Sequence, residues 1–227
     1  MKTDPVVVVS GALKGIGKAV CELFMQARFK VVALGPPGTG EIPSFRSGYL
    51  PILKNIQSDR DGALIIESAL EKFHHIDLVV HAACNFPESL KPEIHSKDIS
   101  KSFSEIFFPT VILSDAALSY FSTIRQGHMI FLTPGGKNLN NPIPLNQTCS
   151  DSALISYIQN IRPIALEYSI GITELQYEDT PTPNEIQENP IRILDITKSI
   201  WLAARTPNPE KYQQIPLKSS EKLKPHS

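Results

Sequence analysis

The chain has 227 residues, of which 41% are hydrophobic and 20% are charged. Lysine and arginine number 22 and aspartate and glutamate 23, and this net charge of −1 gives no indication of nucleic-acid binding, so we expect no nucleic-acid partner. The length suffices for one α/β domain with a full core, and we expect residues 1–227 to form a single domain.

Cysteine usage and hydropathy predict where the protein resides. The three cysteines, Cys21, Cys84 and Cys149, lack paired spacing, which predicts reduced thiols. We see no signal-peptide layout and expect no apolar run of transmembrane length, so we expect a cytoplasmic protein that does not associate with membranes. His74 and His75 have no third ligand at suitable spacing, and we expect no metal site.

Apolar strands alternate with amphipathic helices along the chain, a pattern typical of a parallel sheet with helices on both faces. In the first half, strands are predicted over Val6–Ser10, Lys30–Leu34, Tyr49–Leu53 and Ile76–His81, and helices over Gly15–Arg28 and Asp61–Phe73.

The second half continues the alternation. Helices are predicted over Asp98–Phe121, where Pro109 should bend the helix or mark its start, Ser150–Tyr168, which contains Pro163, and Asp195–Ala204. Strands are predicted over Met129–Leu132, Ile172–Leu175 and Tyr212–Pro216, with a loop over Glu178–Pro190. The order predicts an α/β fold, a doubly wound parallel sheet of seven strands in a three-layer α/β/α Rossmann arrangement.

A glycine-rich turn joins the first strand to the first helix. The segment Ser10-Gly11-Ala12-Leu13-Lys14-Gly15-Ile16-Gly17 has the spacing G-x-x-x-G-x-G and follows four valines directly. Such a turn directs backbone N–H groups and the positive end of a helix toward a pyrophosphate. The structural alternative is that the glycines serve only close packing of strand and helix.

This turn resembles the T-G-x-x-x-G-I-G turn of the short-chain dehydrogenase/reductase family. Asn55-Ile56 lies where the family has an aspartate and an apolar residue that hold adenine, and His81-Ala82-Ala83-Cys84 lies where it has N-N-A-G. Further matches are Asp115–Leu118 in the fifth helix and Ala165-Leu166-Glu167 followed by Gly171-Ile172.

The resemblance implies a site for NAD or NADP. The residues expected to bind it are Ser10, Gly11, Leu13, Gly15, Ile16, Gly17, Asn55, Ile56, Ala82 and Ala83. We expect this site to be weakened, with the nicotinamide half held loosely. The acid usual at the end of the second strand is replaced by Gly35-Pro36-Pro37, with Glu41 and Arg46 further on, and Glu178-Asp179 replaces the family's Pro-Gly.

The family acts through a tyrosine and a lysine in a Y-x-x-x-K motif, and none of the six tyrosines here has a lysine four residues later. One alignment places Gln147 at the tyrosine position and Asp151 at the lysine position, and another places Ser150 and Leu154 there. Thr133-Pro134 lies where the family has its serine, and the helical asparagine position falls near Ile106. We therefore assign no catalytic residue and expect a regulatory or scaffolding protein.

Two alternatives stay open. One is a working oxidoreductase with a rebuilt acid–base group at Thr133, His81 or Asp151. Against it, an aspartate near a helix start is most simply an N-cap or first-turn acid, and an isolated histidine is more often a packing residue. The other alternative is an inactive partner subunit of a heteromeric reductase.

The fifth and sixth helices carry more apolar residues than one core-facing stripe needs. The surplus runs from Phe103 to Leu113 and from Leu154 to Ile164. The family assembles through these helices, so we expect a homo-oligomer whose interface includes Phe107 and Ile158.

Overall fold

The computed structural model describes residues 4–38, 47–83, 95–134, 145–177, 190–205 and 213–217. The first half contains β1 (Val6–Ser10), α1 (Gly15–Gln26), β2 (Lys30–Gly35), β3 (Tyr49–Leu53), α2 (Asp59–Phe73) and β4 (Leu78–His81). The second half contains α3 (Ser96–Ser102), the π-helical turn η1 (Phe103–Phe107), α4 (Phe108–Ile124), β5 (Gly127–Pro134), α5 (Leu145–Glu167), β6 (Ile170–Tyr177), α7 (Pro190–Arg205) and β7 (Gln213–Leu217).

The strands form one seven-stranded sheet in the order β3-β2-β1-β4-β5-β6-β7. Every neighbouring pair is parallel, as the alternating pattern predicted. The direction of winding reverses between β1 and β4, so the crevice at the carboxyl ends of these two strands is where such sheets bind ligands.

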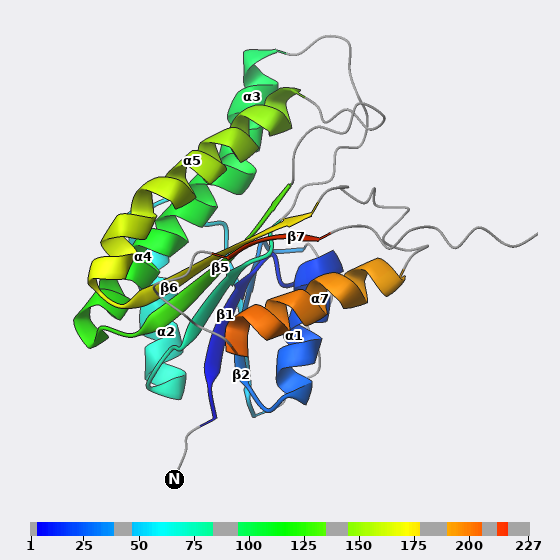
Figure 1. Cartoon of the computed structure of the whole chain (residues 1–227). Coiled ribbons are helices and arrows are strands. Elements are labelled where there is room, and N and C mark those ends of the chain that lie inside the picture. The colour runs from blue at the N-terminus through cyan, green and yellow to red at the C-terminus, as the bar shows by residue number, and fades with distance from the viewer. Residues whose placement is uncertain are drawn as a thin grey trace, which may run out of the picture.

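Helices cover both faces of the sheet, which confirms the three-layer arrangement (Figure 1). α2, α4 and α5 lie on one side, where their apolar residues pack with Val6, Val79 and Phe131 in one core. α1 and α7 lie on the other side over Val7, Val80 and other residues of a second core. Cys21 is buried in this second core, which agrees with the prediction of a reduced thiol in the first helix.

Pro109 separates two helical segments. It lies in the first turn of α4, where its missing N–H breaks no α-helical hydrogen bond, and η1 connects α4 to α3. The prediction that Pro109 bends the helix or marks its start is therefore confirmed. Pro163, by contrast, lies within α5, which continues to Glu167.

The sequence placed several boundaries wrongly. α5 begins at Leu145 rather than Ser150, so Asp151 lies in its second turn and is neither an N-cap nor a first-turn acid. β5 and β6 each extend beyond their predicted bounds, because the backbone ladder between them runs from Gly127 with Ile170 to Pro134 with Tyr177. β4 begins two residues late, at Leu78.

The apolar residues of α4 and α5 that are exposed are not the ones that the sequence predicted for an interface. Ile158 is fully buried in the core against the sheet, so this residue cannot form an interface. Phe107 is half-buried and packs against the same core. Phe108, Ile164 and Leu166, in contrast, are each about half exposed, at 50%, 48% and 50%.

Among the described residues, the helical stretch Ser96–Ile124 is long and apolar enough by composition to cross a bilayer, contrary to our expectation from the sequence. One third of its most apolar window is buried inside the protein. Leu113, Ala117 and Phe121 are fully buried against the sheet. The core helix of a soluble protein can have the same length and hydropathy.

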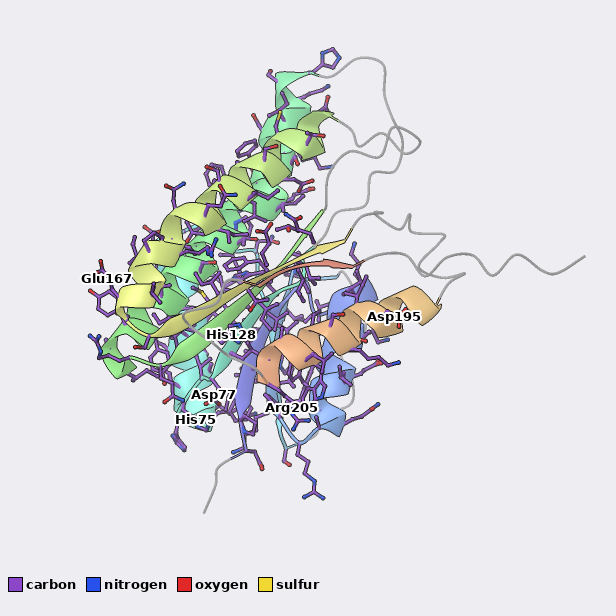
Figure 2. All side chains as sticks on the ribbon, viewed as in Figure 1. His75, Asp77, His128, Glu167, Asp195 and Arg205 are labelled. Atoms are coloured by element: carbon purple, nitrogen blue, oxygen red, sulfur yellow. The ribbon has the colours of Figure 1, made fainter. Side chains whose placement is uncertain are left out.

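Polar side chains anchor the amino ends of the strands, opposite the crevice. The Asp77 carboxylate accepts a hydrogen bond from Val6 N–H at 2.7 Å and lies 3.3 Å from His75 Nε2 (Figure 2). His128 contacts Thr173 Oγ1 through Nε2 at 2.9 Å. These contacts align β1 with β4 and β5 with β6.

The turn between β1 and α1 is closely packed at two glycines. A Cβ on Gly17 would overlap the carbonyl oxygen of Gly11 and lie 2.6 Å from its carbonyl carbon. Gly11 has φ +69°, and a Cβ there would lie 2.7 Å from Ala83 Cα. Backbone atoms cannot yield as a flexible side chain could, so both positions require glycine.

We predict that Gly17→Ala lowers the free energy of unfolding by about 2 to 4 kcal/mol, because the new methyl group must displace backbone. Gly48→Ala is the control, since its nearest neighbour would be 3.9 Å away, and it should change stability by less than about 0.5 kcal/mol. Urea denaturation of both variants measures the difference. Equal stabilities would contradict the close packing.

Candidate functional site

The glycine turn and the end of β4 are in direct contact, as expected for a shared binding crevice. Gly11 lies on the backbone of Ala82 and Ala83, and Ala82 N–H donates to the carbonyl oxygen of Ser10 at 3.2 Å. The structure therefore brings together the predicted site residues from the ends of β1 and β4.

The amino end of α1 is open to an anion. Its cap residue, Lys14, makes no side-chain capping hydrogen bond, and the first turn contains no acid. Gly15 has φ +54°, and no atom of the described residues lies within 4 Å of a Cβ placed on it. α2 differs, because Ser58 and Asp61 form a capping box at its start. An amino end of α1 without a side-chain cap, beside the space at Gly15, fits a phosphate.

The predicted adenine residues lie two strands away and are linked to the turn. Lys54 N–H donates to the carbonyl oxygen of Gly35 at 3.0 Å, and a Cβ on Gly35 would lie 2.6 Å from the Leu13 side chain. Ile56 packs on the core and Asn55 is exposed. The two thus follow β3 at the carboxyl edge of the sheet, and their binding of adenine stays a prediction.

A charged contact at Asp61 holds the segment that follows β3, and the sequence alone did not identify it. The Asp61 carboxylate accepts hydrogen bonds from Gln57 N–H and Ser58 N–H, each at 3.0 Å, and lies 2.7 Å from Lys54 Nζ. The hydrogen-bonded contact with Lys54 holds the pKa of Asp61 well below its usual range, and the bond from Gln57 N–H acts in the same direction.

His81 ends β4 on the side of the sheet that carries α4. Its ring stacks on Phe131 with centroids 4.6 Å apart, and Nε2 lies 3.0 Å from Ser114 Oγ. Complete burial lowers the pKa of His81 to about 3, so the ring is neutral at physiological pH. A base with so low a pKa is weak, and this environment favours a packing role.

The Thr133 side chain is hydrogen-bonded to the neighbouring strand β6. Its hydroxyl donates to Glu174 Oε1 at 2.8 Å, and Gln176 Nε2 donates to the same oxygen at 2.9 Å. Thr133 and Glu174 are both fully buried. A hydroxyl has one proton to donate, so Thr133 cannot polarise a substrate carbonyl while it remains bonded to Glu174.

Asp151 is the buried acid of α5 in the same layer. It is 7% exposed, and its Oδ2 has no hydrogen-bond partner among the residues that the structure describes. Burial raises the pKa of Asp151 to about 7. The adjacent Ser150 lies 2.7 Å from Ser102 Oγ of α3, which fixes this part of α5 against α3.

Other predicted positions carry little structural information. Gln147 lies within α5, but its side chain is outside the described residues. Glu41, Arg46, Cys84, Glu178 and Asp179 also lie outside them. Ile106 is buried within η1, and Leu154 in the core. No group of three or more potential metal ligands gathers among the described residues.

A model of the short chain dehydrogenase family matches residues 5–189. The chain is 26% identical over 145 residues to the agropine synthesis reductase of Rhizobium rhizogenes, and 26% identical over 157 residues to hydroxysteroid dehydrogenase-like protein 2 of Bos taurus. The matches cover 61% and 63% of this chain, but only 34% and 37% of those proteins. The chain thus spans about a third of the length of these curated relatives.

Solved structures share the fold. A short chain dehydrogenase from Leptospira borgpetersenii with bound NAD+ superposes with a TM-score of 0.79 at 12% identity, covering 94% of this chain and 91% of that one. A 3-ketoacyl-(acyl-carrier-protein) reductase from Brucella melitensis complexed with NADH gives 0.79 at 14% identity, with 95% and 96% covered. At this identity the likeness establishes the fold alone.

We predict that Asp151→Asn makes the protein more stable at pH 8 than the original, by up to about 4 kcal/mol. The folded state holds the Asp151 proton more tightly than the unfolded state does, so the free energy of unfolding falls as pH rises from about 4 to about 7. His81 and His128, whose pKa values burial lowers to about 3 and about 4, act equally in both proteins. Denaturation across this pH range tests the prediction, and parallel profiles would contradict it.

Proposed function

Since the chain belongs to the short-chain dehydrogenase family, whose members bind NAD(P) and are oxidoreductases, we propose that it binds NAD or NADP without the family's standard carbonyl chemistry. The observation that carries the first part is the open, uncapped amino end of α1 beside Gly15. We propose a regulatory or scaffolding role in the cytoplasm for a single domain spanning residues 1–227.

The residues present fit a dinucleotide across the crevice. The N–H groups from Gly11 to Gly17 would hold the pyrophosphate, and Asn55 with Ile56 the adenine. Ala82 and Ala83 have small side chains and lie beside Gly11, so they would leave room for the dinucleotide to cross this point. A bound nicotinamide would supply hydride transfer.

The chemistry of the remaining side chains supports the second part of the proposal. The Thr133 hydroxyl donates its hydrogen bond to Glu174, and His81 is neutral and buried. No tyrosine of the chain precedes a lysine by four residues. The alternative, a rebuilt oxidoreductase, is favoured by one observation: the pKa of Asp151, about 7, suits an acid–base group.

We predict that the purified protein binds NAD(H) or NADP(H) but reduces no aldehyde or ketone of a broad panel. Loss of a general acid alone slows such reactions by about a hundred- to ten-thousand-fold. Calorimetric titration measures binding, and absorbance of the reduced cofactor measures turnover.

Gly15→Leu tests whether the turn is the binding site, because its side chain would fill the open space at the end of α1. It should weaken binding at least about tenfold while circular dichroism stays unchanged. Turnover abolished by this substitution, or by Asp151→Asn, would establish the oxidoreductase alternative. Co-purification with an active homologous subunit would favour the partner-subunit alternative.

We propose, further, that the protein self-associates through α4 and α5. Phe108 is 50% exposed and Ile164 is 48% exposed, each on a helix that already buries a separate apolar stripe. Exposed apolar side chains of this size on two neighbouring helices favour burial against a second copy.

Phe108→Glu and Ile164→Glu should therefore shift the protein toward the monomer at tens of micromolar, because the new carboxylates would be buried in the interface. Leu202→Glu is the matched control, since Leu202 is a 63% exposed leucine on α7, in the opposite layer. Light scattering across a concentration series measures the mass. A monomeric original protein, or an oligomer unaffected by either α4 or α5 substitution, would refute this interface.

A further inference from the structure

Asp151 lies on the face of α5 that is directed at the sheet. Buried residues follow one another on this face at helical spacings of three and four: Asp151, Leu154, Ile158, Ile161 and Ala165. The last four belong to the core between α5 and the sheet. Asp151 continues their row by one turn, so its carboxyl group is buried on the sheet side of α5.

The course of α5 places Asp151 near the carboxyl ends of the strands. α5 connects the end of β5 to the start of β6, two parallel neighbours, so it runs antiparallel to both. Figure 1 shows α5 along one side of these strands, with its early turns near their carboxyl ends. Asp151 is in the second turn of α5 and so belongs to this end.

The sheet order identifies the half of a dinucleotide that would be nearest. The strands β1 to β3 form one mononucleotide-binding half and β4 to β6 the other, with the pyrophosphate at their junction. Asn55 and Ile56, after β3, belong to the adenosine half. Asp151, on the helix after β5, belongs to the nicotinamide half.

We infer that Asp151 makes this site select the oxidised cofactor, NAD+ or NADP+, over the reduced one. The inference rests on the proposed binding of a dinucleotide. The oxidised nicotinamide ring carries a positive charge, whereas the dihydronicotinamide ring is neutral. A buried carboxylate attracts the first through space and gains no comparable energy from the second.

Three described groups on this side of the sheet, His81, Ser150 and Glu174, carry no positive charge. His81 is neutral and fully buried, and Ser150 is hydrogen-bonded to Ser102. Glu174, on the same side of the sheet, is a second acid. Among the residues that the structure describes, Asp151 Oδ2 has no hydrogen-bond partner.

Selection of the oxidised form would let the proposed regulatory protein respond to the ratio of oxidised to reduced cofactor. If a protein binds NAD+ or NADP+ more tightly than the reduced form, the fraction of protein with bound oxidised cofactor rises with the oxidised share of the cellular cofactor. Such a response needs no turnover, so it is compatible with the side chains found at the family's tyrosine and lysine positions.

The test is the ratio of two dissociation constants, that of the reduced cofactor divided by that of the oxidised cofactor. Calorimetry with the full chain measures this ratio for NADH and NAD+ and again for NADPH and NADP+. At pH 8.5 the Asp151 carboxyl is ionised. We expect a ratio above one, which Asp151→Asn lowers at least about tenfold. Asp151→Glu keeps the charge and should keep a ratio above one.

Asp115→Asn is the matched control. Asp115 is an exposed acid of α4 that accepts a hydrogen bond from Tyr157, outside the crevice. This substitution should leave the ratio unchanged, because it removes no charge near the nicotinamide half.

Equal ratios in the original protein and Asp151→Asn, or a ratio below one in the original, would overturn the inference while leaving the proposed function intact. If neither ADP-ribose nor any of the four cofactors binds at millimolar concentration, the proposed function fails and the inference falls with it. The unfolding profile of Asp151→Asn verifies in the same samples that the variant is folded.

Discussion

The backbone of the β1–α1 turn is packed so closely that a Cβ atom fits at neither Gly11 nor Gly17. Gly17 lies against the carbonyl group of Gly11, and Gly11 lies against Ala82 and Ala83. This contact presses the first turn of α1 onto the end of β1 and joins both to β4. The position of the crevice therefore depends on backbone packing at two glycines, whichever ligand the crevice binds.

Gly15 shows that packing is not the whole explanation of the motif. It has a positive φ, +54°, but faces open space, so the close contacts of Gly11 and Gly17 do not extend to it. The uncapped N–H groups of α1 begin at the same point. A turn that served packing alone would need no open, anion-accepting surface there, and for this reason we favour retained binding of a phosphate.

The two layers of helices differ in polarity near the crevice. Beneath α4 and α5, buried polar side chains form pairs: Ser102 with Ser150, His81 with Ser114, and Thr133 with Glu174. Each pair gives a partner to at least one polar atom on each side chain that would otherwise be costly to bury, while His81 Nδ1 has no partner among the described residues. Asp151 lies in this layer, and its Oδ2 has no partner among the described residues.

The amino-acid sequence by itself determined the fold and the location of the crevice. The β-branched run Val6–Val9 favours a buried strand, and the glycine spacing favours a tight strand-to-helix turn, because both are properties of a short segment. The sequence did not determine which apolar residues of α4 and α5 face outward. Ile158 is core and Phe108 is exposed, a division set by the way each helix lies on the sheet.

Only the tertiary structure decided the environment of the polar residues. From the sequence, Asp151 read as a helix-capping acid, since the five residues that precede Ser150 in α5 show no apolar periodicity. Burial of the second turn against α3 and the sheet makes it an isolated acid with a raised pKa. Glu174, in an apolar strand, gave no signal until Thr133 of the neighbouring strand was found bonded to it. Such pairings join residues about 40 positions apart, and the energy of a buried charge depends on those distant partners rather than on local sequence.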